Sequence, residues 1–189
     1  KKFEGRIGLF RMGQEWTPIG WPEDDLPPDL TLALSAQAVS LTFHREQLLF
    51  PAFEKVIVYP KPFPSPEHPY PHSSELFGPD GCLIFSAENV MRAFVNPGRL
   101  YNVGMHEYAK AFILAYPDES WPAFTSETVW QDLEAVSGMS REHVETTVGL
   151  SGLDTLPVAI HHYFIFPTNF KKAFPTENDL LEKVFSASI

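Results

Sequence analysis

Residues 101 to 112, YNVGMHEYAKAF, place a histidine beside a glutamate on a predicted helix. Zinc peptidases carry His-Glu-x-x-His in such a helix. Residues i and i+4 lie on one face with Cβ atoms about 5 to 6 Å apart, so both histidines bind one Zn²⁺ and the glutamate polarises its bound water. This chain has His106 and Glu107 but carries Lys110 in place of the second histidine. The pattern matches the zinc-peptidase helix with one ligand replaced, although by itself His-Glu-x-x-Lys is a fragment that any helix can carry by chance.

Lys110 opposes metal binding at its position. A protonated lysine has three N–H donors and no lone pair, and its positive charge repels a dication. The plainest interpretation of Glu107 and Lys110 is an i, i+3 ion pair on a solvated helix, worth roughly a few tenths of a kcal/mol. A sharper hypothesis places the Lys110 ammonium near the position of the missing metal, held by Glu107 or another polar neighbour, so that a fixed cation replaces the bound one.

The elements that position this helix follow from local patterns. Leu and Ala recur at helical spacing over Leu30–Phe43, and Asp29 is the expected N-cap. Residues 55–60 and 82–86 are apolar runs typical of buried strands. Further helices are expected over 87–95, 101–116, 126–138, 154–166 and 176–185.

Two segments are expected to lack regular structure. Residues 1–29 are rich in Gly, Pro and Trp and should form an irregular arm whose apolar side chains pack on the body. Residues 61–81 carry six prolines, which exclude a helix or a central strand and predict a long surface loop. Residues 30–189 are expected to form a single domain, because 189 residues with 44% apolar residues suffice for one core.

Composition excludes several classes of function. The formal net charge of −10 and the scattered Lys and Arg residues oppose nucleic-acid binding, which needs a clustered basic surface. No apolar run approaches the roughly 18 residues of a membrane span. The single cysteine, Cys82, excludes an internal disulfide and leaves histidines and carboxylates as the metal ligands. We expect a cytoplasmic protein, but the chain begins at Lys1, so an N-terminal anchor or signal upstream stays open.

Four segments, in their order along the chain, carry a family resemblance: LALSAQAVSLTF, VIVYPKPF, GCLIFSAENVMRAFVNPGRLYNVGMHEYAKAF and DTLPVAIHHYFIFPTNFKKAFP. They resemble an early Ala-rich helix, a strand ending in Tyr-Pro-x-x-Phe, a segment leading to Asn-Val-x-x-His-Glu-Phe-Ala-His, and a closing helix followed by Phe-Pro. Such features are typical of the Mlc titration factor A family, the glucose-regulated zinc metallopeptidases, which this chain therefore resembles. The resemblance runs from about Leu30 to Phe185. It implies an α+β fold of the zincin-like type, with a small mixed sheet covered by helices.

The family's functional residues are only partly present. Within the resemblance, His106 matches the first zinc ligand and Glu107 the general base. The second ligand falls on Lys110, the third, a glutamate at the head of the later helix, falls on Thr155, and the active-site tyrosine falls on Val148. The resemblance therefore implies a vestigial metal site at His106, Lys110 and Thr155, with Glu107 as a vestigial general base.

The function implied is that of a degenerate zinc-metallopeptidase-like protein. Such a protein would be catalytically inactive, would need no metal or other cofactor, and would bind a protein or peptide in a regulatory role. An extended segment in the old substrate cleft could add to the edge of the sheet. The family's namesake binds a sugar-responsive transcriptional repressor, but no residue here identifies that interface. A purely structural domain with an empty cleft is a further possibility.

An active zinc-dependent aminopeptidase with a nonstandard ligand set is the main alternative. His161 and His162 could join His106, or His68 or His72 could approach from the Pro-rich loop. Adjacent residues of a helix point about 100° apart, so at most one of the adjacent pair faces the site. Hydrogen-bonded histidines in or near the core are the plainer interpretation of that pair, and a solvent-exposed loop is the plainer interpretation of the other two.

Overall fold

The structure is a computed structural model that describes residues 1–23, 25–48, 50 and 52–186. Its first half contains α1 (Lys2–Gly13), β1 (Glu15–Pro18), α2 (Pro28–Thr42), β2 (Lys55–Tyr59), β3 (Ser74–Phe77), the 3-10 turn η1 (Gly78–Asp80), β4 (Cys82–Ser86) and α3 (Ala87–Val95). The second half is helical, with α4 (Val103–Ala115), α5 (Val129–Ser137), α6 (Arg141–Val148), α7 (Thr155–Ile165), α8 (Pro167–Ala173) and α9 (Pro175–Ser186). The fold class is α+β, as predicted.

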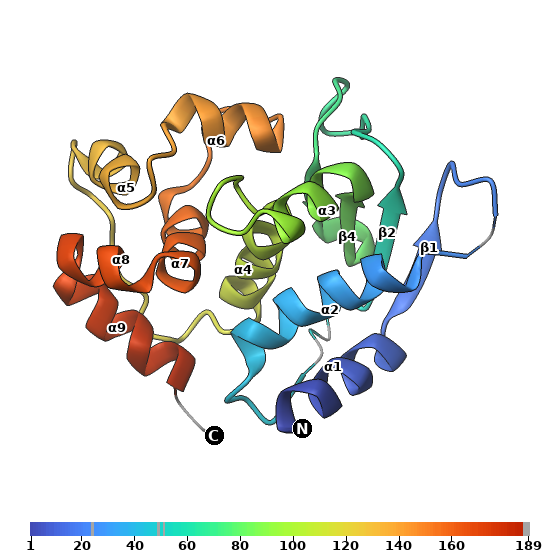
Figure 1. The fold of residues 1–189 in the computed structure, drawn as a ribbon, viewed down its shortest axis with the longest axis horizontal. Coiled ribbons are helices and arrows are strands. Elements are labelled where there is room, and N and C mark those ends of the chain that lie inside the picture. Colours follow the sequence, from blue (N-terminus) through green and yellow to red (C-terminus); the bar gives the residue numbers. More distant parts are fainter. Residues whose placement is uncertain (24, 49, 51, 187–189) are drawn as a thin grey trace.

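Within the described residues, one mixed sheet has the strand order β1-β2-β4-β3 (Figure 1). β2 lies parallel to both β1 and β4, whereas β3 is antiparallel to β4 and forms the last strand in that order. Every residue of β4 is buried. The strands predicted over 55–60 and 82–86 are confirmed as β2 and β4.

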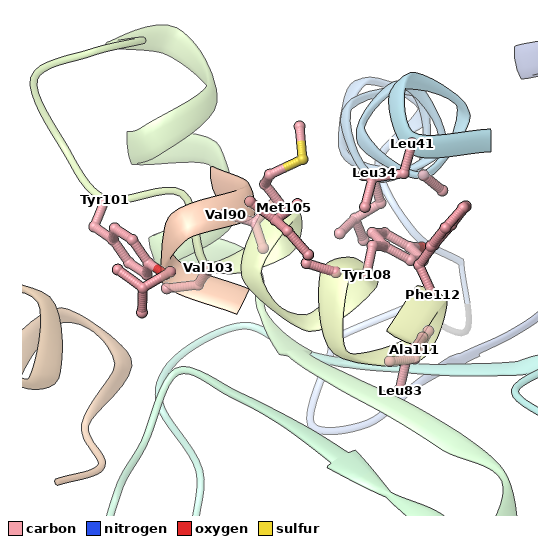
Figure 2. Packing of buried hydrophobic residues seen from close by; sticks show 14 of the residues in the cluster. Leu34, Leu41, Leu83, Val90, Tyr101, Val103, Met105, Tyr108, Ala111 and Phe112 are labelled. Atoms are coloured by element: carbon pink, nitrogen blue, oxygen red, sulfur yellow. The ribbon is translucent and has the colours of Figure 1, made fainter. Parts of the chain in front are cut away.

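Helix α4 runs between the sheet side of the molecule and the C-terminal helices (Figure 1). It contacts α2, α3, β3 and β4 on one side and α7 on the other. An apolar stripe along α4 is buried: Met105, Tyr108, Ala109 and Phe112. Figure 2 shows Tyr108 and Phe112 near Leu34 and Leu41 of α2. Burying such side chains contributes roughly 1.5 to 3 kcal/mol each, so the apolar stripe anchors the helix that carries the polar site.

Two local features fix where α4 starts and how closely it packs. The Asn102 side chain accepts a hydrogen bond from the backbone N–H of Met105 at 3.0 Å, which caps the helix. One residue into the helix, Gly104 lies against α2. A Cβ atom there would meet the amide end of the Gln37 side chain, so a larger residue would require that side chain to move.

The prediction of an irregular arm over 1–29 is wrong for most of its length. Residues 2–13 form α1, which packs on α2 and buries Ile7 and Phe10. Residues 15–18 form β1, which gains its backbone partners from β2. Both elements depend on partners distant in sequence, and these outweigh the local Gly and Pro content. A smaller correction concerns Asp29, which lies in the first turn of α2 while Pro27 occupies the N-cap.

The prediction of a structureless loop over 61–81 is also wrong in part. Residues 74–77 contain no proline and form β3 against β4, and an isolated bridge joins Phe63 to His72. Besides α1, the helices α6 and α8 were not predicted. Those predicted near 87–95, 101–116, 126–138, 154–166 and 176–185 are confirmed. Within the described residues, no helix combines the length and apolarity that crossing a membrane requires.

Candidate functional site

Glu107 lies on the side of α4 that faces β3 and is completely buried. Ser74 of β3 donates a hydrogen bond from its Oγ to Glu107 Oε1 at 3.0 Å. The other carboxylate oxygen, Oε2, is 2.9 Å from Lys110 Nζ. The contact between Glu107 and Lys110 is an ion pair, and Glu107 Oε2 accepts no hydrogen bond from the described residues. The Glu107 side chain is fully buried and Lys110 is one-third exposed. The expectation of an ion pair on a solvated helix face is therefore wrong.

His106 is buried on the adjacent face of α4. Its Nδ1 lies 2.7 Å from the hydroxyl oxygen of Tyr101, which precedes the helix. Burial lowers the pKa of His106 to about 4; the negative charge of Glu107 opposes this effect and the positive charge of Lys110 adds to it. His106 is therefore neutral at pH 7, and its orientation is fixed by one strong polar contact.

A cavity of about 210 Å³ adjoins this face of α4, and His106 and Lys110 both contribute to its wall. The rest of its lining comes from two other parts of the chain: His68, Tyr70, Leu150, Ser151, Gly152, Leu153, Asp154 and Pro157. Loop residues before β3 and the N-terminal end of α7 therefore close the cavity opposite α4.

A second hollow of about 380 Å³ contains Thr155, the position predicted to have lost the third ligand. Its lining is Lys110, Ile113, Leu114, Asp154, Thr155, Leu156 and Pro157. Lys110, Asp154 and Pro157 line both spaces. The structure thus brings the three predicted positions close together. Lys110 lines the smaller cavity together with His106 and the larger hollow together with Thr155.

Val148, which matches the family's active-site tyrosine, offers no polar side-chain atom. Its side chain is fully buried at the end of α6, and its backbone oxygen accepts a hydrogen bond from the Ser73 N–H at 2.7 Å. It does not line either space at Lys110. This position braces the chain just before β3.

The adjacent histidines of α7 are fully buried and hydrogen-bonded. His161 Nε2 accepts from the Asn102 N–H at 3.1 Å. His162 Nδ1 donates to the Val158 oxygen at 2.8 Å, and its Nε2 lies 2.9 Å from Ser137 Oγ. Burial lowers the pKa of His162 to about 4 and holds the pKa of His161 well below its usual range. Both side chains brace α4 and α5 from within the core, and neither lines the spaces at Lys110.

The expectation of a solvent-exposed loop histidine is wrong for His72, which is only 1% exposed. Its Nδ1 lies 3.0 Å from the Tyr70 backbone oxygen and its Nε2 lies 3.0 Å from Glu75 Oε2. His72 forms a backbone bridge with Phe63, and the centroids of the two rings lie 4.6 Å apart. These contacts hold His72 in a buried position. His68 is half-buried and lines the smaller cavity. Cys82 is a buried free thiol.

Several residues around the site were not predicted, namely Tyr101, Ser74, Glu75 and Asp154. Ser74 and Glu75 lie within residues 61–81, for which the sequence predicts a loop and no strand. The run Ser-Glu-Leu-Phe neither alternates in polarity nor contains a β-branched residue, so it gave no local signal for β3.

Comparisons with known proteins add no relationship to this geometry. No protein-family model matches the chain. No curated protein matches its sequence significantly. The family resemblance therefore stays a prediction that the motifs alone support.

Proposed function

We propose that this protein is a catalytically silent, metallopeptidase-like protein of zincin-like fold, and that it binds an extended peptide or protein segment in a regulatory role. The observation that carries the proposal is the ion pair between Lys110 and the buried carboxylate of Glu107, 2.9 Å apart. It supports a site in which a fixed ammonium occupies the place of a metal ion.

This ion pair opposes both parts of zinc-peptidase chemistry. A zinc ion on His106 would be placed beside the Lys110 ammonium, and the two positive charges would repel. A general base must accept a proton from water, but the Glu107 carboxylate already neutralises an ammonium and accepts a hydrogen bond from Ser74. Both carboxylate oxygens of Glu107 are therefore already engaged by other side chains.

The surroundings of Lys110 favour binding instead. The larger hollow combines apolar side chains of α4 and α7 with one positive and one negative side chain, Lys110 and Asp154. Leu114 on its wall is 59% exposed. β3, the last strand in the sheet order, lies against α4, and a strand edge can pair with the backbone of an extended segment. An extended peptide beside β3 would place its side chains toward these hollows.

No observation favours the alternative of an active peptidase with a rebuilt metal site, because His161 and His162 are held by hydrogen bonds in the core. The proposal therefore includes no metal at His106. We also propose a cytoplasmic location.

Leu114→Asp is expected to weaken peptide binding at least about tenfold, equivalent to about 1.4 kcal/mol, because it places a charge on the apolar wall of the larger hollow. Fluorescence anisotropy with a library of labelled extended peptides would identify a ligand and measure this change. The same peptides should stay intact with or without added zinc.

Leu9→Asp is the matched control, because Leu9 on α1 is 58% exposed and lies outside both hollows. It should change the affinity by less than about twofold, within about 0.4 kcal/mol. Equal losses in the two variants would contradict binding at this site. Peptide cleavage that a zinc chelator abolishes would contradict the silent assignment, and binding of no peptide or protein would leave a purely structural domain.

A further inference from the structure

A second group of metal-ligating side chains lies apart from the positions of the zinc-peptidase motif. One ligand atom from each of Glu67, His68 and Glu75 lies within 4.8 Å of the other two. Glu67 is exposed, His68 is half-buried, and Glu75 on β3 is only 3% exposed. The group therefore joins the Pro-rich loop to the strand at the edge of the sheet.

Glu75 has a free oxygen in a buried position. His72 Nε2 holds Oε2 at 3.0 Å, whereas Oε1 has no hydrogen-bond partner among the described residues. A buried acceptor without a partner costs about 1 to 3 kcal/mol, and a charged one costs more. A bound cation would satisfy this oxygen.

His72 orients the Glu75 carboxylate. The Tyr70 backbone oxygen, which can only accept, lies 3.0 Å from His72 Nδ1, so this nitrogen donates. Nε2 lies 3.0 Å from Glu75 Oε2, so the imidazole ring fixes the position of this carboxylate oxygen. Metal-binding carboxylates are commonly held in this way by a neighbouring hydrogen bond, which fixes the oxygen that faces the metal.

The charge of the group also favours a cation. Two carboxylates this close repel each other unless a positive charge lies between them. Within the described part of the chain, no lysine or arginine forms an ion pair with Glu67 or Glu75. The loop is also held in place, because the Ser65 N–H donates to the His68 oxygen at 2.8 Å and the His68 N–H donates to Ser65 Oγ at 3.1 Å.

We propose that Glu67, His68 and Glu75 bind a divalent cation, with Zn²⁺ the best fit to one imidazole and two carboxylates. Tetrahedral zinc, with bonds of about 2.0 to 2.2 Å, holds its ligand atoms roughly 3.3 to 3.6 Å apart, so a loop movement of roughly 1.5 Å closes the site. A water molecule completes the four-coordinate set. Because His68 also lines the smaller cavity, the cation fixes the loop wall that faces His106.

Calorimetric titration of the full chain with zinc chloride tests the site. We expect one zinc ion per chain, and at least about tenfold weaker binding in Glu67→Gln and in Glu75→Gln, equivalent to about 1.4 kcal/mol. Glu67 is exposed, so its variant cannot act by unfolding the protein. Unchanged affinity in His106→Ala separates this site from the motif positions.

Two results would overturn the proposal. One is the absence of zinc binding by the unmodified chain. The other is zinc binding that both glutamine variants retain and that His106→Ala abolishes, which would place the metal at the motif and also contradict the proposed function. His143→Ala, at an exposed histidine on α6, controls for surface imidazole binding and should leave the affinity unchanged.

Discussion

Lys110→Met is expected to lower the free energy of unfolding by about 3 kcal/mol or more, measured by urea denaturation at pH 7. Methionine keeps most of the aliphatic stem but removes the ammonium. The Glu107 carboxylate would then stay fully buried with the Ser74 hydroxyl as its remaining polar contact. An uncompensated buried charge is costly, so the loss should far exceed that for an exposed pair.

Arg141→Met is the matched control for this prediction. Arg141 pairs with Glu145 at 2.8 Å on α6, with exposed side-chain fractions of 51% and 19%. Breaking it should cost less than about 1 kcal/mol. The double variant Lys110→Met with Glu107→Gln should recover most of the loss, because no unpaired charge remains and the amide oxygen still accepts from Ser74. Equal costs for Lys110→Met and Arg141→Met would contradict a buried, structurally important ion pair.

Stability is expected to fall steeply as the pH is lowered from about 6.5 toward 4. Burial lowers the pKa of His106 and of His162 from 6.5 to about 4. Between these values the unfolded chain binds protons that the folded chain excludes, so stability rises with pH there and is fully present above about 6.5. Each shift corresponds to roughly 3 kcal/mol for these buried groups. Urea denaturation at several pH values measures the slope.

His106→Gln separates this effect from the general acid sensitivity of an acidic protein. Glutamine can keep a polar contact with Tyr101 but does not titrate, so the slope between pH 6.5 and 4 should become shallower. His143→Gln, at an exposed position, should leave the dependence of stability on pH the same as in the unmodified protein. An unchanged slope in His106→Gln would show that this histidine is not kept neutral by folding.

Elements with strong local patterns could be predicted from the sequence. The Ala and Leu spacing predicts the start of α2 to within two residues. The helix predicted over 126–138 corresponds to α5, which ends at Gly138 with φ of 76°. Helix α6 had comparable signals that were overlooked. Ser140 caps it by accepting from the His143 N–H, and Gly149, with φ of 84°, ends it. β1 and β3 could not be found in the same way, because β2 and β4 provide their partners.

For the candidate site, too, the sequence identified residues that are close together in the chain and missed contacts between distant segments. His106, Glu107 and Lys110 stand close together in sequence, so the motif and helical geometry identified them. The contact between Lys110 and the start of α7 depends on how α4 packs against α7, which only the tertiary structure shows. The contacts of Tyr101 with His106, and of Ser74 with Glu107, link segments whose approach no local pattern specifies.

Zinc titration of two variants tests most directly whether Lys110 has replaced a metal. Both carry Glu67→Gln to weaken the proposed loop site, and the second also carries Lys110→His and Thr155→Glu, which complete the family's ligand set. The first should bind no zinc at His106. The second should bind one zinc ion at least about 100-fold more tightly than the first variant binds zinc anywhere, equivalent to about 2.7 kcal/mol. Adding His106→Ala to the second variant should abolish this binding. Stoichiometric zinc binding by the first variant that His106→Ala abolishes would contradict the replacement of the metal by Lys110.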